Sequence, residues 1–524
     1  MKTKFSVGWA GAFVGFWLMS GPISAQTAEE REGGATRSID PATAEIIRQM
    51  QRRIDDLEQK VKRLEQTKTT ESLTNQTAER RVEELDQKVR VLERNRELEQ
   101  EAAEAKAKEA PRISLDDRGF SLASANGDFS IQLKGVLQVD TRTFFDDGGT
   151  AGNDGILLRR ARPMLQGTLF RDFDFLFVPD FAGSSPQIFD AYLNYRYAPE
   201  LQFQAGKFKV PVGLEQLQAD RDVLFNERGL PTDLVPNRDL GFELHGDLFN
   251  GVASYAAGIF NGVGDARNSG NADFEDNKAF AGRLFLQPFK GTPASFLQGF
   301  GFGLSGSYED MQTPNATGLP ATTGGSLAGY ATVGQQQFFA YNPAAENGRT
   351  PVVLAAGGHE RLSPQAYYYY GPFSLLGEYV ISDQEVSRTV VEPLKTARLV
   401  NTAWQVQAGW VLTGEDAAFS GGVVPRHPFK PSQGDWGALQ LVARYGQLNI
   451  DPDAFPTFAD PTASARSASE WSIGLNWWLN RNVRIATSFS RTTFDGGGGP
   501  GSVAPASVTR QPENVLFTRM QLAF

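Results

Sequence analysis

Basic side chains recur at alternate positions of strand-like segments, a spacing that places cations along one polar face. In one segment Arg160 and Arg162 share their parity with Gln166, whereas Ala161 and Leu165 fall on the opposite, apolar parity. Because the side chains of a strand alternate between its two faces, both guanidinium groups are expected on the polar face. A guanidinium group matches the oxygen atoms of phosphate and carboxylate, so the chemistry that these residues could carry out is anion binding.

The same parity gives further candidates for an anion-binding surface. They are Lys134, Arg142, Arg196, Arg283, Arg444 and Arg484. Arg159 falls on the apolar parity and is expected to snorkel or to lie at a rim. The plainer alternative is that acids on the same faces pair with these bases, and Asp140, Asp190, Glu243 and Asp247 are available. The chain carries a net charge of -10, so its total charge does not indicate anion preference, which charge at a constriction would decide.

An enzyme active site finds little support in the sequence. The histidines, His245, His359 and His427, are far apart without metal-ligand spacing, and no Gly-x-Ser-x-Gly motif accompanies them. The lack of cysteine excludes disulfides, thiol chemistry and thiolate metal sites. We therefore expect no catalytic residue, no metal, no cofactor and no nucleic-acid partner.

Strands must position the basic residues. After Pro111 the hydrophobic period is two, and sixteen segments alternate apolar with polar side chains. They are 129–143, 157–170, 173–181, 188–197, 201–209, 240–249, 252–261, 278–287, 300–309, 364–370, 373–382, 399–411, 437–449, 470–478, 483–494 and 515–524. No segment after the leader approaches the ~18 consecutive apolar residues of a membrane helix, whereas a closed barrel satisfies every backbone group in lipid. Residues 125–524 are therefore expected to form an all-β transmembrane barrel of about 16 antiparallel strands with room for a water-filled channel.

The connections between these segments alternate in length. Short turns, such as 171–172 and 371–372, alternate with longer polar loops, an asymmetry typical of barrels whose short turns face the periplasm. Two connections break this rule. Residues 182–187 are short where an outer loop is expected, and residues 412–436 are long where a periplasmic turn is expected.

The last segment ends the chain on an aromatic residue. Leu516, Met520 and Leu522 share a parity with Phe524, whereas Arg519 falls on the other. This ending resembles the C-terminal signature of bacterial outer-membrane barrel proteins. The resemblance implies contact with outer-membrane lipid and recognition of Phe524 by the barrel-assembly machinery.

One stretch narrows the expected function. Residues 201–239 contain Gly206-Lys207-Phe208, Gly213-Leu214-Glu215 and Glu227-Arg228, and upstream stand Leu158-Arg159-Arg160-Ala161-Arg162 and Phe189-Asp190-Ala191-Tyr192. These motifs resemble the phosphate-selective porin O and P family, in layout over most of residues 125–524 and densely between about 130 and 245. The resemblance implies a bacterial outer-membrane porin, assembled as a homotrimer, through which small anionic solutes such as phosphate diffuse passively.

The resemblance also implies site residues. In the family an arginine ladder lines the lumen; it carries over to Arg159 and Arg160, and a basic residue after the Gly-Leu-Glu motif carries over to Arg221. The pore-lining candidates are Lys134, Arg159, Arg160, Arg162, Arg196, Arg221, Arg283 and Arg484, and the constriction-loop candidates are Lys207, Lys209, Glu215 and Arg228. Where the family often reads Gly-Gly-Arg, this chain reads Lys134-Gly135-Val136, so one ladder arginine is missing. A general porin without ion preference and an outer-membrane adhesin remain as alternatives.

The first hundred residues differ from the rest. Residues 1–25 resemble an export signal with cleavage after Ala25, and residues 26–46 are expected to be a flexible segment. Residues 47–96 repeat apolar side chains in heptads, which predicts an α-helical coiled coil in the periplasm, and residues 97–124 are expected to be a linker. The a positions of the predicted coiled coil include Ile47, Ile54, Val61, Val82 and Val89, and its d positions include Met50, Leu57, Leu64, Leu85 and Leu92. β-Branched residues at a with Leu at d favour a two-stranded coiled coil, whereas porins are usually trimers. A dimer, a trimer and a single solvated helix therefore all stay open.

Overall fold

The computed structural model describes residues 41–145, 152–183, 185–270, 276–312, 327–342, 352–389, 395–498 and 509–524. The chain divides into two compact units, Met1–Ala102 and Ala103–Phe524. The predicted export signal, residues 1–25, and residues 26–40 of the predicted flexible segment lie outside the described residues.

The helical part of the chain is one long helix, α1 (Pro41–Glu109, 69 residues). Its heptad side chains are exposed, with Ile47 at 45% and Leu92 at 67%. Pairs one turn apart, such as Lys60 with Asp56 at 2.9 Å, add a modest stabilisation. The predicted helix is thus confirmed, whereas its association into a coiled coil stays a prediction.

Among the described residues, no helix combines the length and the hydropathy needed to cross a membrane.

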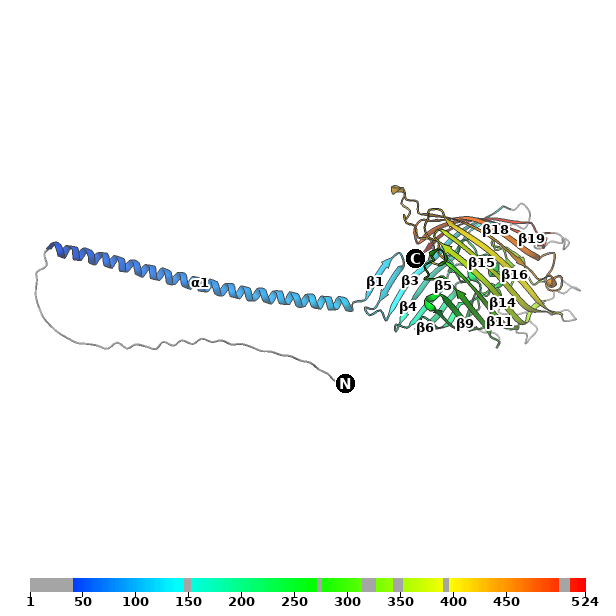
Figure 1. Ribbon diagram of the computed structural model, residues 1–524, viewed down its shortest axis with the longest axis horizontal. Coiled ribbons are helices and arrows are strands. Elements are labelled where there is room, and N and C mark those ends of the chain that lie inside the picture. Colours follow the sequence, from blue (N-terminus) through cyan, green and yellow to red (C-terminus); the bar gives the residue numbers. More distant parts are fainter. Residues whose placement is uncertain are drawn as a thin grey trace. The chain divides into compact units, whose positions relative to one another are not determined.

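The second unit contains a closed barrel of sixteen antiparallel strands, as predicted (Figure 1). They are β3 (Ser130–Phe144), β4 (Gly155–Leu169), β5 (Phe173–Asp180), β6 (Gln187–Ala198), β7 (Leu201–Lys209), β8 (Arg238–Leu248), β9 (Ala253–Phe260), β10 (Ala279–Leu286), β11 (Phe300–Gln312), β14 (Val352–Tyr370), β15 (Phe373–Thr389), β16 (Lys395–Val411), β17 (Ala438–Asn449), β18 (Ala465–Trp478), β19 (Val483–Gly496) and β20 (Glu513–Ala523). Each strand pairs with the next, and β20 closes onto β3, with Val515 opposite Phe144 and Ala523 opposite Val136.

A hairpin extends the edge of β3 where the sequence predicted a linker over residues 97–124. Helix α1 continues to Glu109, and β1 (Arg112–Asp116) and β2 (Gly119–Ala123) follow it, with Phe120 of β2 opposite Leu133 of β3. Gly119 has φ +99°, and a Cβ there would lie 2.3 Å from the carbonyl oxygen of Leu133, so the tight approach requires glycine. The hairpin was missed because each of its strands has only five residues.

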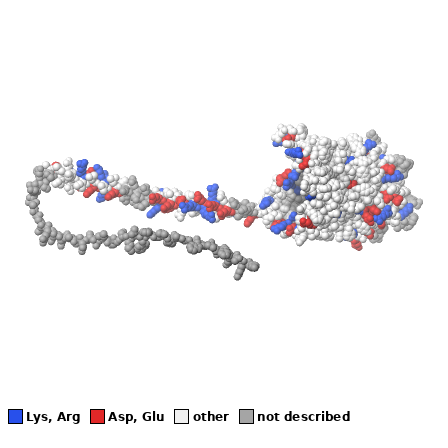
Figure 2. Space-filling view, viewed as in Figure 1, with Lys and Arg blue, Asp and Glu red and all other residues white. Residues whose placement is uncertain are grey.

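The outer surface of the barrel is apolar and its inner surface is polar. Along β18, Trp471, Ile473 and Leu475 are exposed, while Ser472 and Asn476 on the opposite parity are buried in the lumen wall. On the face seen in Figure 2, a largely uncharged band crosses the barrel, and charged residues gather toward its two ends. This is the surface that a bilayer requires of a transmembrane barrel.

Connecting segments fill part of the lumen. The inner loop, residues 210–237, contains α2 (Leu214–Leu217) and the 3-10 helix η1 (Leu230–Leu234). The segment 327–342 carries β12 (Tyr330–Ala331) and β13 (Gln337–Phe339), and it packs with the inner loop in one hydrophobic cluster. As the sequence indicated, the connection between β5 and β6 is short and the loop between β16 and β17, residues 412–437, is long. Short 3-10 turns complete the fold: η2 (Phe249–Gly251), η3 (Ser295–Leu297), η4 (Pro431–Gln433) and η5 (Pro452–Ala454).

Candidate functional site

The inner loop is fixed to the far wall of the barrel by its first acidic residue and its backbone. The Leu214 N–H donates to Glu378 Oε2 of β15 at 2.6 Å, and Glu215 Oε2 accepts from Gly229 N–H and from Gln405 Nε2, both at 2.8 Å. Glu215 is fully buried. This predicted constriction-loop residue therefore holds the two ends of the loop together and to β16.

Wall arginines hold the middle of the inner loop. Arg484 Nη1 donates to the carbonyl of Val223, and Arg444 Nη1 donates to the carbonyl of Glu227, both at 2.9 Å. Both guanidinium groups are buried beneath the loop. Parity alone placed them in the lumen, but it could not show that the loop covers them.

A β-bulge brings two consecutive arginines to the lumen. Gln138 of β3 lies opposite Arg160, but Val139 lies opposite Leu158, so Arg159 is the extra residue of β4. Arg159 Nε and Nη2 donate to the two carboxylate oxygens of Glu227 on the inner loop, at 2.6 and 2.9 Å. The expectation that Arg159 lies at a lipid-facing rim is wrong, because the bulge shifts the strand parity by one residue.

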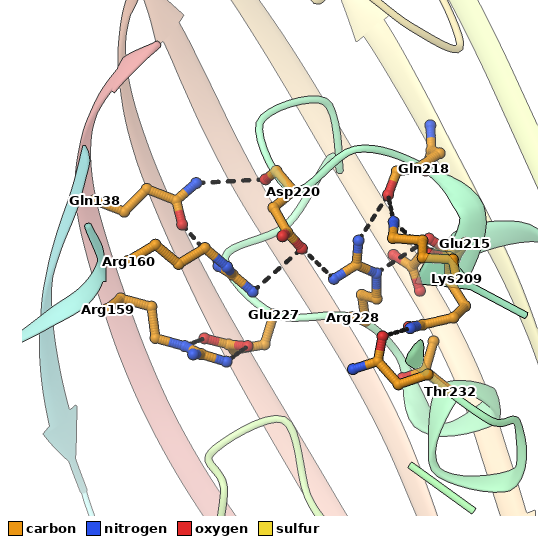
Figure 3. A network of polar contacts seen from close by, with 12 residues as sticks. Gln138, Arg159, Arg160, Lys209, Glu215, Gln218, Asp220, Glu227, Arg228 and Thr232 are labelled. Atoms are coloured by element: carbon orange, nitrogen blue, oxygen red, sulfur yellow. Dashed lines mark hydrogen bonds and ion pairs between the residues drawn. The ribbon is translucent and has the colours of Figure 1, made fainter. Parts of the chain in front are cut away.

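Asp220 of the inner loop lies at the centre of a cluster of arginine side chains (Figure 3). Its carboxylate pairs with Arg228 at 2.5 Å, with Arg160 at 3.5 Å, and closely with Arg162. Burial alone would raise the pKa of Asp220, but the surrounding guanidinium groups outweigh it and hold the pKa well below its usual value. For Glu227 burial is likewise outweighed, first by Arg159, and its pKa is lowered. Both carboxylates are therefore ionised and offset part of the arginine charge.

Two guanidinium groups lie against one phenylalanine next to Asp220. The Cζ atoms of Arg162 and Arg238 are 3.8 and 4.7 Å from the centroid of the Phe189 ring. Arg162 also pairs with Asp180 at 2.6 Å, and Arg238 pairs with Asp190 at 3.1 Å. Arg238 is absent from the predicted site residues because the sequence pattern predicts a loop over residues 210–239, whereas β8 begins at this residue.

Three cavities follow one another through the lumen and share lining residues. The outer cavity, about 480 Å³, and the middle chamber, about 470 Å³, share Arg162, Asp220 and Arg238. The middle chamber and a lower cavity of about 170 Å³ beside Phe524 share Lys134 and Arg221. We call these shared sets the first and second junctions. Each contains more cationic than anionic side chains.

The other predicted residues lie elsewhere. Lys209 Nζ donates to the carbonyls of Gln216 and Gln218 and so supports the inner loop from the middle chamber. Lys207 Nζ donates to the carbonyl of Ser269, away from the three cavities. Arg196 pairs with Asp174 at 2.8 Å near the short turns, and Arg283 contacts Gln365 and lies 4.5 Å from the Phe285 ring.

The histidines are not brought together. His359 is buried between Glu309 and Ser382, His245 contacts Asn194, and His427 is exposed. Within the described part of the chain no group of histidine and carboxylate side chains has the arrangement of a metal site.

The comparison with protein families decides the assignment. The family model for phosphate-selective porin O and P matches residues 131–524. The chain belongs to this family. This porin is an outer-membrane channel protein, and its family and barrel point to a channel rather than to an enzyme. Among curated protein sequences none matches it.

Solved barrel structures are similar to this porin at low identity. The outer membrane channel DcaP of Acinetobacter baumannii is 9% identical, with 76% of this chain and 97% of that chain covered and a TM-score of 0.46. The anion-selective porin from Comamonas acidovorans is 12% identical, with 76% and 100% covered and a TM-score of 0.42. OmpF of Salmonella typhi in complex with daunomycin is 12% identical, with 76% and 99% covered and a TM-score of 0.44.

Proposed function

We propose that this porin conducts small solutes across the outer membrane by passive diffusion and prefers anions, including phosphate. The observation that carries the proposal is the excess of cations at both junctions. The first junction has Arg162 and Arg238 against Asp220, and the second has Lys134 and Arg221. Because the electric field is focused where a channel narrows between low-dielectric walls, these few charges outweigh the acidic total of the chain.

The second junction gives the stronger support for anion preference. Among the described residues Lys134 has no hydrogen-bonded or ion-paired acid, and Arg221 has only Asp222, at 3.6 Å. The charged groups that act on Lys134 are Arg221 and Arg118, both cationic. Cations along a path that acids offset only in part attract anions and exclude cations of similar size.

Reversal potentials in a salt gradient across a planar bilayer test the proposal. Lys134→Gln and Arg221→Gln should each lower the ratio of chloride to potassium permeability, by about twofold, since each removes one cation from the second junction. Arg171→Gln is the matched control, because Arg171 lies in a short turn with its side chain 73% exposed. Wild-type protein that prefers potassium would overturn the proposal. Competition of phosphate against chloride current then measures phosphate preference.

A general porin without ion preference is the second candidate. It is favoured by the pairing of the arginines at the first junction, where Arg162 contacts two acids and Arg238 one. If the acids fully neutralise the arginines at the first junction, only the second junction would select anions over cations. Equal chloride and potassium permeabilities in wild-type protein would support this candidate.

We further propose that residues 1–25 are removed on export, that α1 associates in the periplasm, and that three copies assemble. The exposed heptad side chains of α1 support association, since a row of apolar residues at a and d positions gains stability by packing between helices. Cross-linking of detergent-solubilised protein tests the number of copies. Leu85→Ser together with Leu92→Ser should weaken the cross-linked product if the helices associate.

A further inference from the structure

The middle chamber has an apolar wall that inorganic phosphate cannot use. Val136 of β3, Met164 of β4, and Leu176 and Val178 of β5 line it from three adjacent strands. Leu217 of the inner loop faces the same space. A hydrated ion gains nothing from apolar side chains, whereas an alkyl or aryl group gains free energy for each methylene group removed from water.

Cations border this apolar wall at both ends. Lys134 is directly opposite Met164 in the pairing of β3 with β4, and Arg221 lines the same end of the chamber. Arg162 and Arg238 stand at the other end, at the first junction. Because Arg162 and Arg238 already bind carboxylates, the less compensated pair at the second junction is the better partner for an anionic head group.

We propose that the middle chamber binds organic anions that carry an apolar tail, with a carboxylate at Lys134 and Arg221 and the tail against Met164 and Leu176. The chamber volume of about 470 Å³ lies within the range of sites that enclose small organic ligands. This inference rests on the proposed anion preference and narrows the class of anion.

The test compares two monocarboxylates with the same head group. Acetate and hexanoate are titrated against the chloride current of the reconstituted wild-type channel. Hexanoate should block the current with an apparent Kd about tenfold lower than that of acetate. Full burial of its extra methylene groups would give a larger difference, but the wall covers only one side of the tail. Hexanoate that binds no better than acetate to a chloride-preferring channel would overturn the inference and leave the proposed function intact. A channel without chloride preference would overturn both.

Variants separate the tail site from the head-group site. Met164→Gln and Leu176→Asn keep the side-chain size and should bring the two apparent Kd values to within about threefold, with the acetate value unchanged. Lys134→Gln should weaken acetate and hexanoate by the same factor. Met311→Gln is the control, since Met311 is a buried residue of β11 that does not line the chamber. If neither polar variant narrows the difference between hexanoate and acetate while Met311→Gln behaves as wild type, the tail does not lie on this wall.

Discussion

The side-chain amide of Gln218 donates a hydrogen bond to the backbone carbonyl of Phe419 across 2.9 Å, which joins the inner loop to the loop between β16 and β17. The Phe419 ring stacks on Tyr367, with centroids 4.9 Å apart, and packs in the cluster that contains Leu214 of α2. The long connection between β16 and β17 therefore supports the inner loop from the side of the short turns. This explains why a connection at that end exceeds the usual length.

Phe419→Ala should loosen this support. The ring is half-buried, so we expect a loss of about 1–2 kcal/mol of stability, below the range for a fully buried aromatic residue, and a noisier open-channel current. Single-channel recording measures the noise. Phe429→Ala is the control, because Phe429 belongs to the same loop but packs against Trp436 and Trp477 instead. Equal noise in the two variants would mean that Phe419 does not support the inner loop.

The pair of Arg159 with Glu227 gives a second prediction. Among the described residues, Arg159→Ala leaves Arg519, at 3.3 Å, as the ion-pair partner of the buried Glu227 carboxylate. It should destabilise the folded barrel by about 2–3 kcal/mol while lowering anion preference. The temperature at which the folded band is lost in gel electrophoresis reports the first effect and reversal potentials report the second. Adding Glu227→Gln should restore most of the stability. A double variant as unstable as the single one would show that Arg159 acts through something other than this carboxylate.

The barrel could be predicted because its physical cause is local. Each strand has its own alternation of apolar and polar side chains in the sequence. The predicted start of the closing strand β20 lies two residues from the observed start. The bulge at Arg159 could not be predicted, because it depends on a carboxylate 68 residues away. Parity likewise identified Arg160, Arg444 and Arg484 as equivalent lumen residues, although the inner loop covers two of them. Which wall arginine meets solute is decided by where a loop folds, and the sequence pattern of the wall carries no information on that.

The hairpin of β1 and β2 gives a third prediction. Gly119→Ala should detach it from β3, since the new Cβ meets a backbone oxygen and the residue must also adopt φ +99°. Gly127→Ala is the matched control, because Gly127 also has a positive φ, +77°. No atom lies within 4 Å of the position that its new methyl group would take, so only the conformational cost of about 1 kcal/mol applies. Amide hydrogen exchange over residues 112–123 should rise strongly in the first variant and little in the second. Similar exchange in both would show that the close approach at Leu133 is not what fixes the hairpin.

Asp233 should make the anion preference of the channel depend on pH. It lines that cavity on the inner loop, where burial raises its pKa to about 8, partly offset by the hydrogen bond from the Ala331 N–H at 3.0 Å. Below this pH the carboxyl is protonated and neutral, and above it the carboxylate adds a negative charge to the cavity that Arg228 and Arg238 also line. Anion preference should therefore fall between about pH 7 and pH 9. Reversal potentials across this range measure the effect. Asp233→Asn keeps an acceptor for Ala331 and should hold the preference constant at its low-pH value, so a variant that retains the full pH dependence would exclude Asp233 as its source.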